Sequence, residues 1–272
     1  MCLEEKFKEL KERKEKALIG FVTAGYPSAE DTLEIALAMV KGGVDILELG
    51  LPFSDPIADG VTIQRASESS LKAGMNPGLF FDVAAEIKGV EKVCLTYYNL
   101  VLQRGLEQFI KDCESAGIKG LVVPDLPVEE SKPLLKICDR YETDLIFIIA
   151  PTTTEKRMAR ILDAASGFIY VVSLLGVTGT REKISDAIYP LIKRIREVNL
   201  NLSRNDVSSV PLAVGFGISK PEHVKTICEV ADGAIVGSAF IRLIEERLES
   251  KESMLHEVEE FTRSLKKETK SV

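Results

Sequence analysis

Short apolar runs alternate with amphipathic segments along most of the chain. The runs are nearly continuous in Val, Ile, Leu and Ala, which is typical of strands in a parallel sheet that is covered on both faces. Eight strands are predicted, at residues 17–23, 44–49, 92–98, 120–124, 145–150, 167–173, 211–215 and 233–237. Helices are predicted between them, at residues 28–42, 60–73, 78–88, 101–116, 129–141, 154–165, 182–198, 219–230 and 238–250.

Capping residues mark the ends of several of these helices. Hydroxyl side chains that cap helix N-termini well stand at four predicted starts, Ser28, Thr154, Ser219 and Ser238. Glycines, which readily take the left-handed conformation of a helix C-terminus, follow three predicted ends, at Gly42-Gly43, Gly74 and Gly117. The signals agree with helices in the gaps between the strands.

Strands alternating with helices in this number predict the α/β class and a closed (β/α)8 TIM barrel. Two predicted helices lie between the second and third strands, so one of them is additional to the barrel unit. An open doubly wound sheet is the alternative, and periodicity alone does not separate the two. Lys220 stands where a dinucleotide fingerprint beginning at Gly215-Phe216-Gly217 would have its third glycine, which disfavours the nucleotide-binding version.

Segments outside the repeat are expected at both ends. Residues 3–16 predict an amphipathic helix, with Leu3, Phe7 and Leu10 on one face, that plugs the bottom of the barrel. The tail, residues 251–272, alternates Glu and Lys and predicts a solvent-exposed helix that frays at its end.

Residues 199–209 are polar and rich in turn-forming residues, so we expect a surface loop before the seventh strand. No linker divides the chain, and its length of 272 residues suits one barrel. We therefore expect a single domain that spans residues 1–272.

Composition narrows the function classes. The net charge is −7 with both signs interleaved, which argues against nucleic acids and anionic membranes as partners. The five cysteines are scattered and form no CxxC pair, which indicates a reducing compartment. No signal peptide and no apolar run long enough to span a membrane are visible, so we expect a cytoplasmic protein.

The segment LELGLPFSDPIADG at residues 47–60 holds the strongest chemical signal. Glu48 lies on an apolar strand, and a carboxylate there is unfavourable unless it is paired or used. Asp59 follows at the entrance to a helix and is expected to converge on the same cavity, although it could instead cap that helix. Two carboxyl groups in different environments suit general acid–base chemistry. Asp55 is most simply a turn former in an exposed loop, where it could also contact a partner.

Three glycine-bearing loops follow the last strands, at residues 173–179, 214–219 and 235–240. Glycine lets an anion approach backbone N–H groups closely, and the last loop leads directly into a helix N-terminus. Adjacent loops of this kind after strands seven and eight of a barrel indicate a phosphate site. The aromatic residues Phe21, Tyr97 and Tyr170 lie in strands and either pack in the core or line an apolar pocket.

Other chemistries lack their residues. His223 and His256 are the two histidines, and both lie in helical patterns, so a histidine zinc site or a Ser-His-Asp triad is not expected. Lys92 would begin its strand rather than end it, which disfavours a Schiff-base aldolase. No P-loop sequence occurs. An acid–base reaction on a phosphorylated, partly apolar substrate remains.

Eight segments resemble the tryptophan synthase alpha chain family in family order, from about residue 17 to residue 250. They are GFVTAGYPS, LELGLPFSDPIADG, TYYNLVLQRG, VPDLPVEES, IAPTT, SLLGVTG, VGFGIS and VGSAF. The resemblance implies a (β/α)8 barrel lyase that cleaves indole-3-glycerol phosphate to indole and glyceraldehyde 3-phosphate in a retro-aldol reaction. It assigns proton transfer to Glu48, and contact with the indole N–H to Asp59.

The resemblance also assigns the other site residues. It implies that Phe21 and Tyr170 line the indole and glycerol pocket and that Gly179, Gly217, Gly237 and Ser238 bind the phosphate. With Tyr97, Gly215 and Thr178, these are the predicted substrate-binding residues. Residues 174–186 would form a lid, with Thr178 contacting Asp59. No metal and no cofactor are expected in this chain.

A partner is implied as well. The family works as an α2β2 assembly with a beta chain that holds pyridoxal phosphate and receives indole through a tunnel. Pro52, Asp55, Asn99 and residues 125–128 would face that partner.

Two alternative functions stay open at the level of sequence. One is a stand-alone indole-3-glycerol phosphate lyase that uses the same acids without a partner. The other is a catalytically silent barrel that binds a phosphorylated ligand and regulates a partner. Another phosphate-binding barrel enzyme, such as an isomerase, would leave the 47–60 segment unexplained.

Overall fold

A computed structural model describes residues 3–172, 181–202, 210–215 and 217–270, with the backbone alone for residues 181–187 and 201–202. Its strands are β1 (Ala17–Thr23), β2 (Ile46–Gly50), β3 (Glu91–Leu95), β4 (Ile118–Val122), β5 (Asp144–Ile146), β6 (Ile148–Ile149), β7 (Ile169–Val172), β8 (Leu212–Gly215) and β9 (Gly233–Val236). Its helices are α1 (Leu3–Glu12), α2 (Ala29–Gly42), α3 (Val61–Lys72), α4 (Pro77–Glu86), α5 (Tyr98–Arg104), α6 (Leu106–Ser115), α7 (Lys132–Arg140), α8 (Glu155–Ala164), α9 (Arg181–Leu202), α10 (Pro221–Cys228), α11 (Ser238–Glu245) and α12 (Lys251–Glu268).

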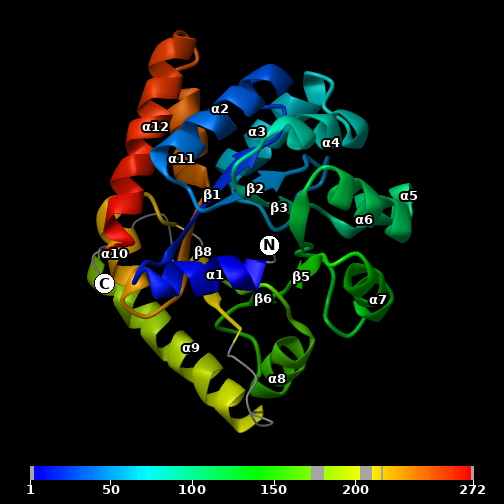
Figure 1. The fold of residues 1–272 in the computed structure, drawn as a ribbon, viewed down its shortest axis with the longest axis vertical. Helices are drawn as coiled ribbons and strands as arrows, with labels where there is room; N and C mark the ends of the chain where they lie inside the picture. Colours follow the sequence, from blue (N-terminus) through cyan, green and yellow to red (C-terminus); the bar gives the residue numbers. More distant parts are fainter. Residues whose placement is uncertain (1–2, 173–180, 203–209, 216, 271–272) are drawn as a thin grey trace.

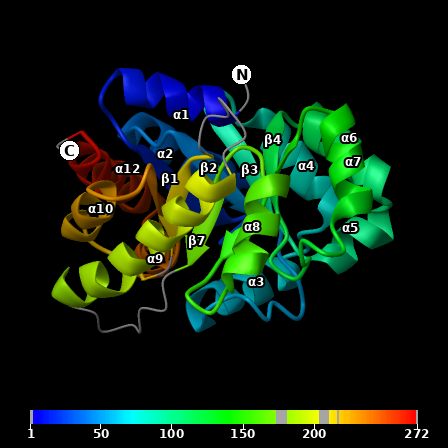
Figure 2. The ribbon, with the colours of Figure 1, turned by 90° about the horizontal axis from the view of Figure 1, so that it is seen from below.

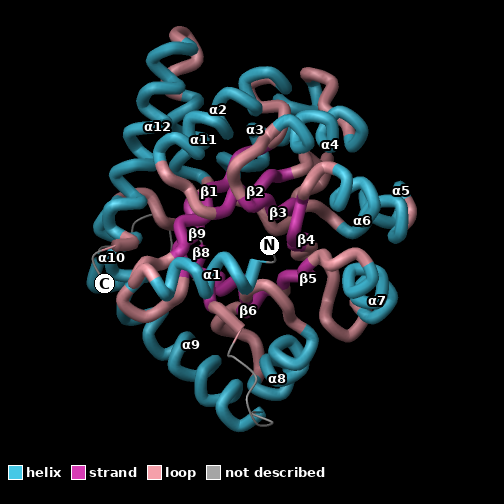
Figure 3. Tube along the Cα trace, viewed as in Figure 1, coloured by secondary structure: helices cyan, strands magenta, loops and turns pink. Residues whose placement is uncertain are grey.

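The strands form one parallel sheet in the order β5-β4-β3-β2-β1-β9-β8-β7-β6. β5 and β6 are two parts of the single strand predicted at residues 145–150, separated only by Phe147, so the ends of the sheet meet. The Phe147 carbonyl still accepts the Tyr170 N–H of β7 at 2.9 Å. The strands form a ring with the helices outside it (Figure 1, Figure 3), which confirms the predicted (β/α)8 barrel. The additional helix after the second strand is also confirmed, because α3 and α4 both precede β3.

Inward-facing side chains fill the barrel at the end that α1 covers. Strand positions two apart point to the same side, so alternate residues of each strand face the interior. The resulting cluster comprises Ala17, Ile19, Ile46, Val93, Val122, Ile146, Phe168, Ala213 and Ile235, together with Leu3, Phe7 and Leu10 of α1. α1 therefore closes one end of the barrel as predicted, and Figure 3 shows it lying across the ring.

Asp144 at the start of β5 holds the plug helix in place. Its Oδ2 accepts the Leu3 N–H at 3.3 Å, at the end of α1 where backbone N–H groups lack partners within the helix. Figure 2 shows α1 at one end of the molecule and α3 toward the other. The loop before α3 thus lies at the barrel end that α1 does not cover.

A buried lysine joins two helices to the outside of the barrel. Lys92 near the start of β3 is 3 % exposed, and its Nζ donates to three carbonyls, those of Ala84 (2.6 Å), Ile87 (2.8 Å) and Ala116 (2.6 Å). Burial lowers the pKa of Lys92 to about 8, but the three acceptors use every N–H of a charged ammonium group. The side chain is at the opposite end of its strand from the carboxyl edge, as predicted, and its role is to hold the ends of α4 and α6.

The tail is helical as predicted, but the prediction of a solvent-exposed helix was wrong, because α12 packs against the rest of the fold. Met254, Val258 and Leu265 are buried on one face of α12. Lys266 pairs with the buried Asp45 at 2.7 Å, and Asp45 also accepts the Leu18 N–H at 2.8 Å. Alternating Glu and Lys concealed an apolar stripe that joins α12 to α2.

Some predicted boundaries also change. The helix predicted at residues 101–116 is two helices, because Gly105 takes a left-handed φ of 87° between α5 and α6. α9 runs to Leu202, so the first part of the loop predicted at residues 199–209 is helical, and the rest lies outside the described residues. None of the described helices combines the length and apolar character needed to cross a membrane.

Of the four predicted N-cap residues, two stand at an N-cap position and two do not. Ser28 caps α2, since its hydroxyl accepts the Asp31 N–H, and Gly43 ends that helix with φ 98°. Thr154 stands at the N-cap of α8 without a side-chain bond to the helix. Ser219 and Ser238 were wrong as N-caps, because Lys220 and Gly237 occupy those positions.

Candidate active site

Glu48 lies in the middle of β2 and points into the barrel. Its backbone is in register with Phe21 of β1 and Val93 of β3. The residue is 1 % exposed, and Oε1 has no hydrogen-bond partner among the described residues. Burial, with a smaller contribution from the nearby Asp59 carboxylate, raises the pKa of Glu48 to about 8. Glu48 is therefore protonated at neutral pH and can donate a proton.

Asp59 belongs to the loop between β2 and α3. The loop holds it through the backbone, since its N–H donates to the Pro56 carbonyl at 3.1 Å and its carbonyl accepts the Gln64 Nε2 at 2.8 Å. Gly60 is the N-cap of α3 and no side chain caps that helix, so the capping alternative for Asp59 is wrong. Burial raises the pKa of Asp59 to about 6, while a hydrogen bond from Tyr97 lowers it in part.

The two carboxyl groups meet at the same end of the barrel, as predicted. The charge of Asp59 contributes to the raised pKa of Glu48, and both groups raise the pKa of the Tyr170 hydroxyl, after burial as the main cause. Three side chains from β2, the following loop and β7 thus share one region. The pKa of Glu48 is raised further than that of Asp59, which favours the proton on Glu48.

Glycines leave room for two aromatic rings, those of Phe21 and Tyr170, in this region. A Cβ on Gly50 would lie 2.7 Å from the Phe21 ring, and a Cβ on Gly215 would lie 2.7 Å from the ring and hydroxyl of Tyr170. Gly237 faces Phe21, where a Cβ would come within 3.4 Å. The absence of these side chains leaves room for Phe21, which is in register with Glu48, and for Tyr170, which lies near enough to feel the charge of Glu48.

Backbone groups suited to an anion lie near the ends of β8 and β9. Gly237 is the N-cap of α11 and Ser238 is its first residue, so the first N–H groups of the helix, at its positive dipole end, follow the carboxyl end of β9. Gly217 takes a left-handed φ of 76° and is exposed after β8. Thr178 and Gly179, also predicted to bind substrate, lie outside the described residues.

Tyr97 differs from a simple pocket-lining residue. It is 2 % exposed, its ring stacks on Phe53 with centroids 5.1 Å apart, and its hydroxyl accepts the Ala58 N–H at 3.1 Å. The hydroxyl thus contacts the loop that carries Asp59. Sequence patterns placed Tyr97 at a strand end but gave no partner for its hydroxyl.

The predicted partner residues separate by exposure. Asp55 and Asn99 are exposed, whereas Pro52 is buried and supports the loop from beneath. Two large apolar side chains are exposed beside Asp55, Ile57 at 82 % and Val61 at 70 %. Val61 also lines a groove, together with Phe53, Ser54, Pro56, Gln64, Arg65, Glu68, Leu71 and Lys72.

Sequence reasoning missed Thr23 at the carboxyl end of β1. It is 1 % exposed, and its Oγ1 has no hydrogen-bond partner among the described residues. A threonine that ends an apolar strand is too ordinary a pattern to have indicated this.

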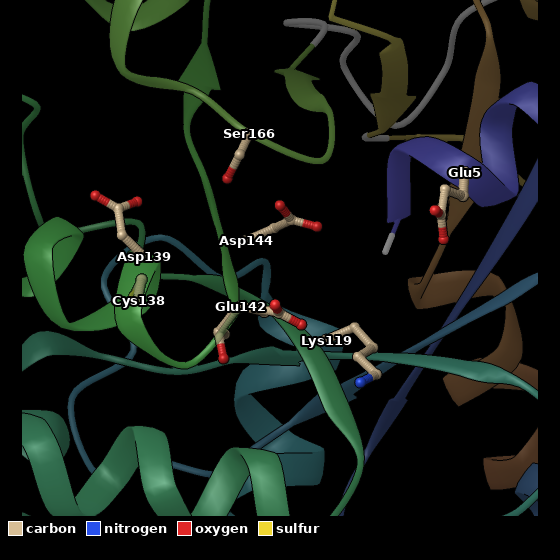
Figure 4. A pocket seen from close by; sticks show the side chains of 8 residues that line it. Glu5, Lys119, Cys138, Asp139, Glu142, Asp144 and Ser166 are labelled. Carbon is tan, nitrogen blue, oxygen red and sulfur yellow. The ribbon is translucent and has the colours of Figure 1, made fainter. Parts of the chain in front are cut away.

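A separate cavity of about 440 Å³ lies at the other end of the barrel (Figure 4). Its lining residues are Glu5, Lys119, Cys138, Asp139, Glu142, Thr143, Asp144 and Ser166. Ser166 hydrogen-bonds Asp144, the residue that holds α1. Within the described part of the chain no acidic, histidine or cysteine side chains are grouped to hold a metal ion, here or elsewhere. The cavity lies beside the plug helix α1, which contributes Glu5 to its lining.

Together, the buried Glu48 and the partly buried Asp59 at the open end of the ring define a (β/α)8 barrel of the acid–base enzyme class. Comparison with known proteins narrows this class. The family model of the tryptophan synthase alpha chain matches residues 7–270, and the chain belongs to that family.

Individual relatives agree over nearly the whole chain. The tryptophan synthase alpha chain of Methanocaldococcus jannaschii is 47 % identical over 253 residues, covering 92 % of this chain and 86 % of the relative. That of Arabidopsis thaliana is 42 % identical over 268 residues, covering 97 % and 94 %. A chain of the solved tryptophan synthase from Mycobacterium tuberculosis is 32 % identical and superposes with a TM-score of 0.87, covering 99 % of this chain and 98 % of that one.

Family membership gives the reaction and its setting. The chain is a lyase of tryptophan biosynthesis that cleaves indole-3-glycerol phosphate to indole and glyceraldehyde 3-phosphate. Its partner is the beta chain, which holds the pyridoxal phosphate of the assembly, and the alpha chain has no cofactor of its own.

Proposed function

We propose that Glu48 moves the protons of the cleavage reaction and that Asp59 stabilises the positive charge that forms on the indole ring. The observation that carries this proposal is the buried Glu48 carboxyl group, whose Oε1 has no hydrogen-bond partner among the described residues, close to Asp59 of the following loop; their raised pKa values, about 8 and about 6, support it. Two carboxyl groups whose environments separate their pKa values are suited to distinct acid and anion roles.

The steps balance without any other reactant. Neutral Glu48 donates its proton to C3 of the indole ring, and the ring becomes a cationic indolenine. Asp59 accepts a hydrogen bond from the ring N–H and stabilises that charge. The Glu48 carboxylate then takes the proton of the glycerol hydroxyl next to the ring, the carbon–carbon bond breaks, and its electron pair restores the indole ring. The products are indole and the aldehyde, and Glu48 is again protonated.

Substrate would lie across the barrel mouth with its indole ring between Phe21 and Tyr170. Gly215 supports this arrangement because it leaves room for the Tyr170 ring. The phosphate would accept hydrogen bonds from the backbone near Gly217, Gly237 and Ser238, where the dipole of α11 favours an anion. Thr178 and Gly179, which the family resemblance assigns to the site, lie outside the described residues.

Indole release by purified variants tests the two acid roles. Glu48→Gln removes the proton donor but keeps the shape, so kcat should fall by about 10²–10⁴-fold. Asp59→Asn removes the anion, and kcat should fall by about 10²–10³-fold. Asp55→Asn, in the same loop but exposed, is the matched control and should keep near-normal turnover of indole-3-glycerol phosphate. Near-normal turnover by Glu48→Gln would reject the assignment, and indole release by the unaltered chain excludes a silent barrel.

The partner face, the domain and the location complete the proposal. Exposed Asp55 and Asn99, with Ile57 and Val61 beside them, support a beta-chain contact at this end of the barrel.

The chain is proposed to be one domain over residues 1–272, which the span of the family match supports. A cytoplasmic location is supported by the four described cysteines, which are all buried and unpaired.

A further inference from the structure

Tyr97 lies between the barrel and the loop that carries Asp59. It lies two residues after the end of β3 and is the N-cap residue of α5. The ring is 2 % exposed and stacks on Phe53, a residue of the same β2–α3 loop, with centroids 5.1 Å apart and planes 24° apart. The ring therefore fixes one side of the loop by packing.

The hydroxyl of Tyr97 makes two contacts with the other side of that loop. It accepts the Ala58 N–H at 3.1 Å, and it donates its own proton to the Asp59 carboxylate. A phenol hydroxyl has one donor and can accept as well, so both functions of the group are used. The Tyr97 hydroxyl oxygen thus holds two adjacent residues of the loop, Ala58 through its backbone and Asp59 through its side chain.

We propose that Tyr97 is a positioning residue for the reaction: its hydroxyl holds Asp59 at the barrel mouth as an anion aimed at the substrate. The inference rests on the function proposed for Asp59. It changes the role expected of Tyr97 from lining the substrate pocket to orienting an acid that touches the substrate.

The surroundings of Asp59 make this hydroxyl important. The described titratable groups that interact with Asp59 are Glu48 from β2, Tyr97 from the end of β3 and Tyr170 from β7. Asp125, from the loop after β4, lies near the Tyr97 hydroxyl and further disfavours its ionisation. Tyr97 is the donor whose bond lowers the pKa of Asp59, against the effect of burial. Loss of this bond would leave Asp59 less ionised and less well oriented.

The test compares Tyr97→Phe with the unaltered chain, both assembled with the beta chain. The variant keeps the stacked ring and removes only the oxygen. We measure kcat and kcat/KM for indole-3-glycerol phosphate cleavage from pH 5 to pH 9. The acidic limb of the kcat/KM profile should shift to higher pH by about one unit, which is the size expected for the loss of one hydrogen bond to a charged group. Consequently kcat should fall more at pH 6 than at pH 8. The substrate phosphate also titrates near pH 6, but identically for both proteins, so only the difference between profiles is interpreted.

Two further variants serve as controls. Tyr98→Phe removes a neighbouring hydroxyl and should leave the profile in place. Phe53→Leu removes the ring stack but keeps the Tyr97 hydroxyl, so it should lower Tm without moving the acidic limb. If Tyr97→Phe fails to assemble, 3-fluorotyrosine at position 97 replaces it; the fluorinated hydroxyl is a stronger donor and should move the limb down.

The outcomes separate this inference from the function on which it depends. A Tyr97→Phe profile that superimposes on that of the unaltered chain overturns the inference, and so does a uniform loss of rate at every pH. If Asp59→Asn is inactive in the same assay, the role of Asp59 still stands in those cases. If Asp59→Asn is fully active, the proposed function itself fails.

Discussion

Replacing Glu48 with glutamine should change how the stability of the fold depends on pH. The folded-state pKa of Glu48 is raised from 4.5 to about 8. A group with a raised folded pKa contributes fully to stability below its unfolded pKa, and that contribution is lost as pH rises toward the folded pKa. The unaltered chain should therefore become less stable than Glu48→Gln, step by step, between about pH 4.5 and pH 8.

The magnitude follows from the burial of the side chain. Glu48 is 1 % exposed, so solvent does not screen the effect. Each pH unit between the two pKa values changes the free energy of unfolding by about 1.4 kcal/mol. Between pH 5 and pH 7.5 the difference between the two proteins should thus grow by about 3 kcal/mol, or by about 6 °C in Tm for a chain of this size.

Thermal unfolding of both proteins at half-unit pH intervals measures this difference. The glutamine side chain adds a packing term of its own, but that term does not vary with pH, so the slope carries the information. With Asp59→Asn in both proteins, the difference should stop growing at a lower pH, because the Asp59 charge is the second cause of the raised pKa of Glu48. A difference in Tm that stays constant from pH 5 to pH 7.5 would show that Glu48 is not held neutral by burial.

Three other replacements test the packing around the barrel. Gly215→Ala places a methyl group 2.7 Å from Tyr170 and should push the ring into the pocket, raising KM for the substrate at least several-fold with a small change in Tm; an unchanged KM would contradict this geometry. Lys92→Met leaves three buried carbonyls without donors and should cost about 3–5 kcal/mol in urea unfolding, whereas Met at the exposed Lys88 should cost almost nothing. Phe7→Ala empties part of the barrel plug and should cost about 3–5 kcal/mol; a loss below about 1 kcal/mol would show that α1 is not part of the core.

The barrel itself was predictable because local patterns and the global fold agree. Continuous apolar strands and capped helices recur in regular order. The spacing of Leu3, Phe7 and Leu10 puts all three on one face of a helix, which indicated a helix that covers the end of the barrel. The acid Glu48 was predictable for a related reason, since a lone carboxylate on a buried strand conflicts with its surroundings. Such conflicts mark functional sites.

What the sequence hid depends on contacts between distant segments. The apolar stripe of α12 is diluted by charged residues, and only its packing on α2 reveals it. Gly105 divides a continuous helical pattern because it adopts a left-handed φ that no neighbouring residue signals. The hydroxyl of Tyr97 has a partner only once the β2–α3 loop has folded over it. Resemblance to the family supplied the reaction, which no pattern in the residues specified.

The pairing of Asp45 with Lys266 has a consequence for how the chain is made. Asp45 lies beside the first barrel strands, but the ammonium group that neutralises it is 221 residues further along. On the ribosome, the early half of the nascent chain therefore emerges with a carboxylate that cannot yet be buried at low cost. The buried position of Asp45 is therefore fully stabilised only after α12, which supplies Lys266, has been synthesised and packed.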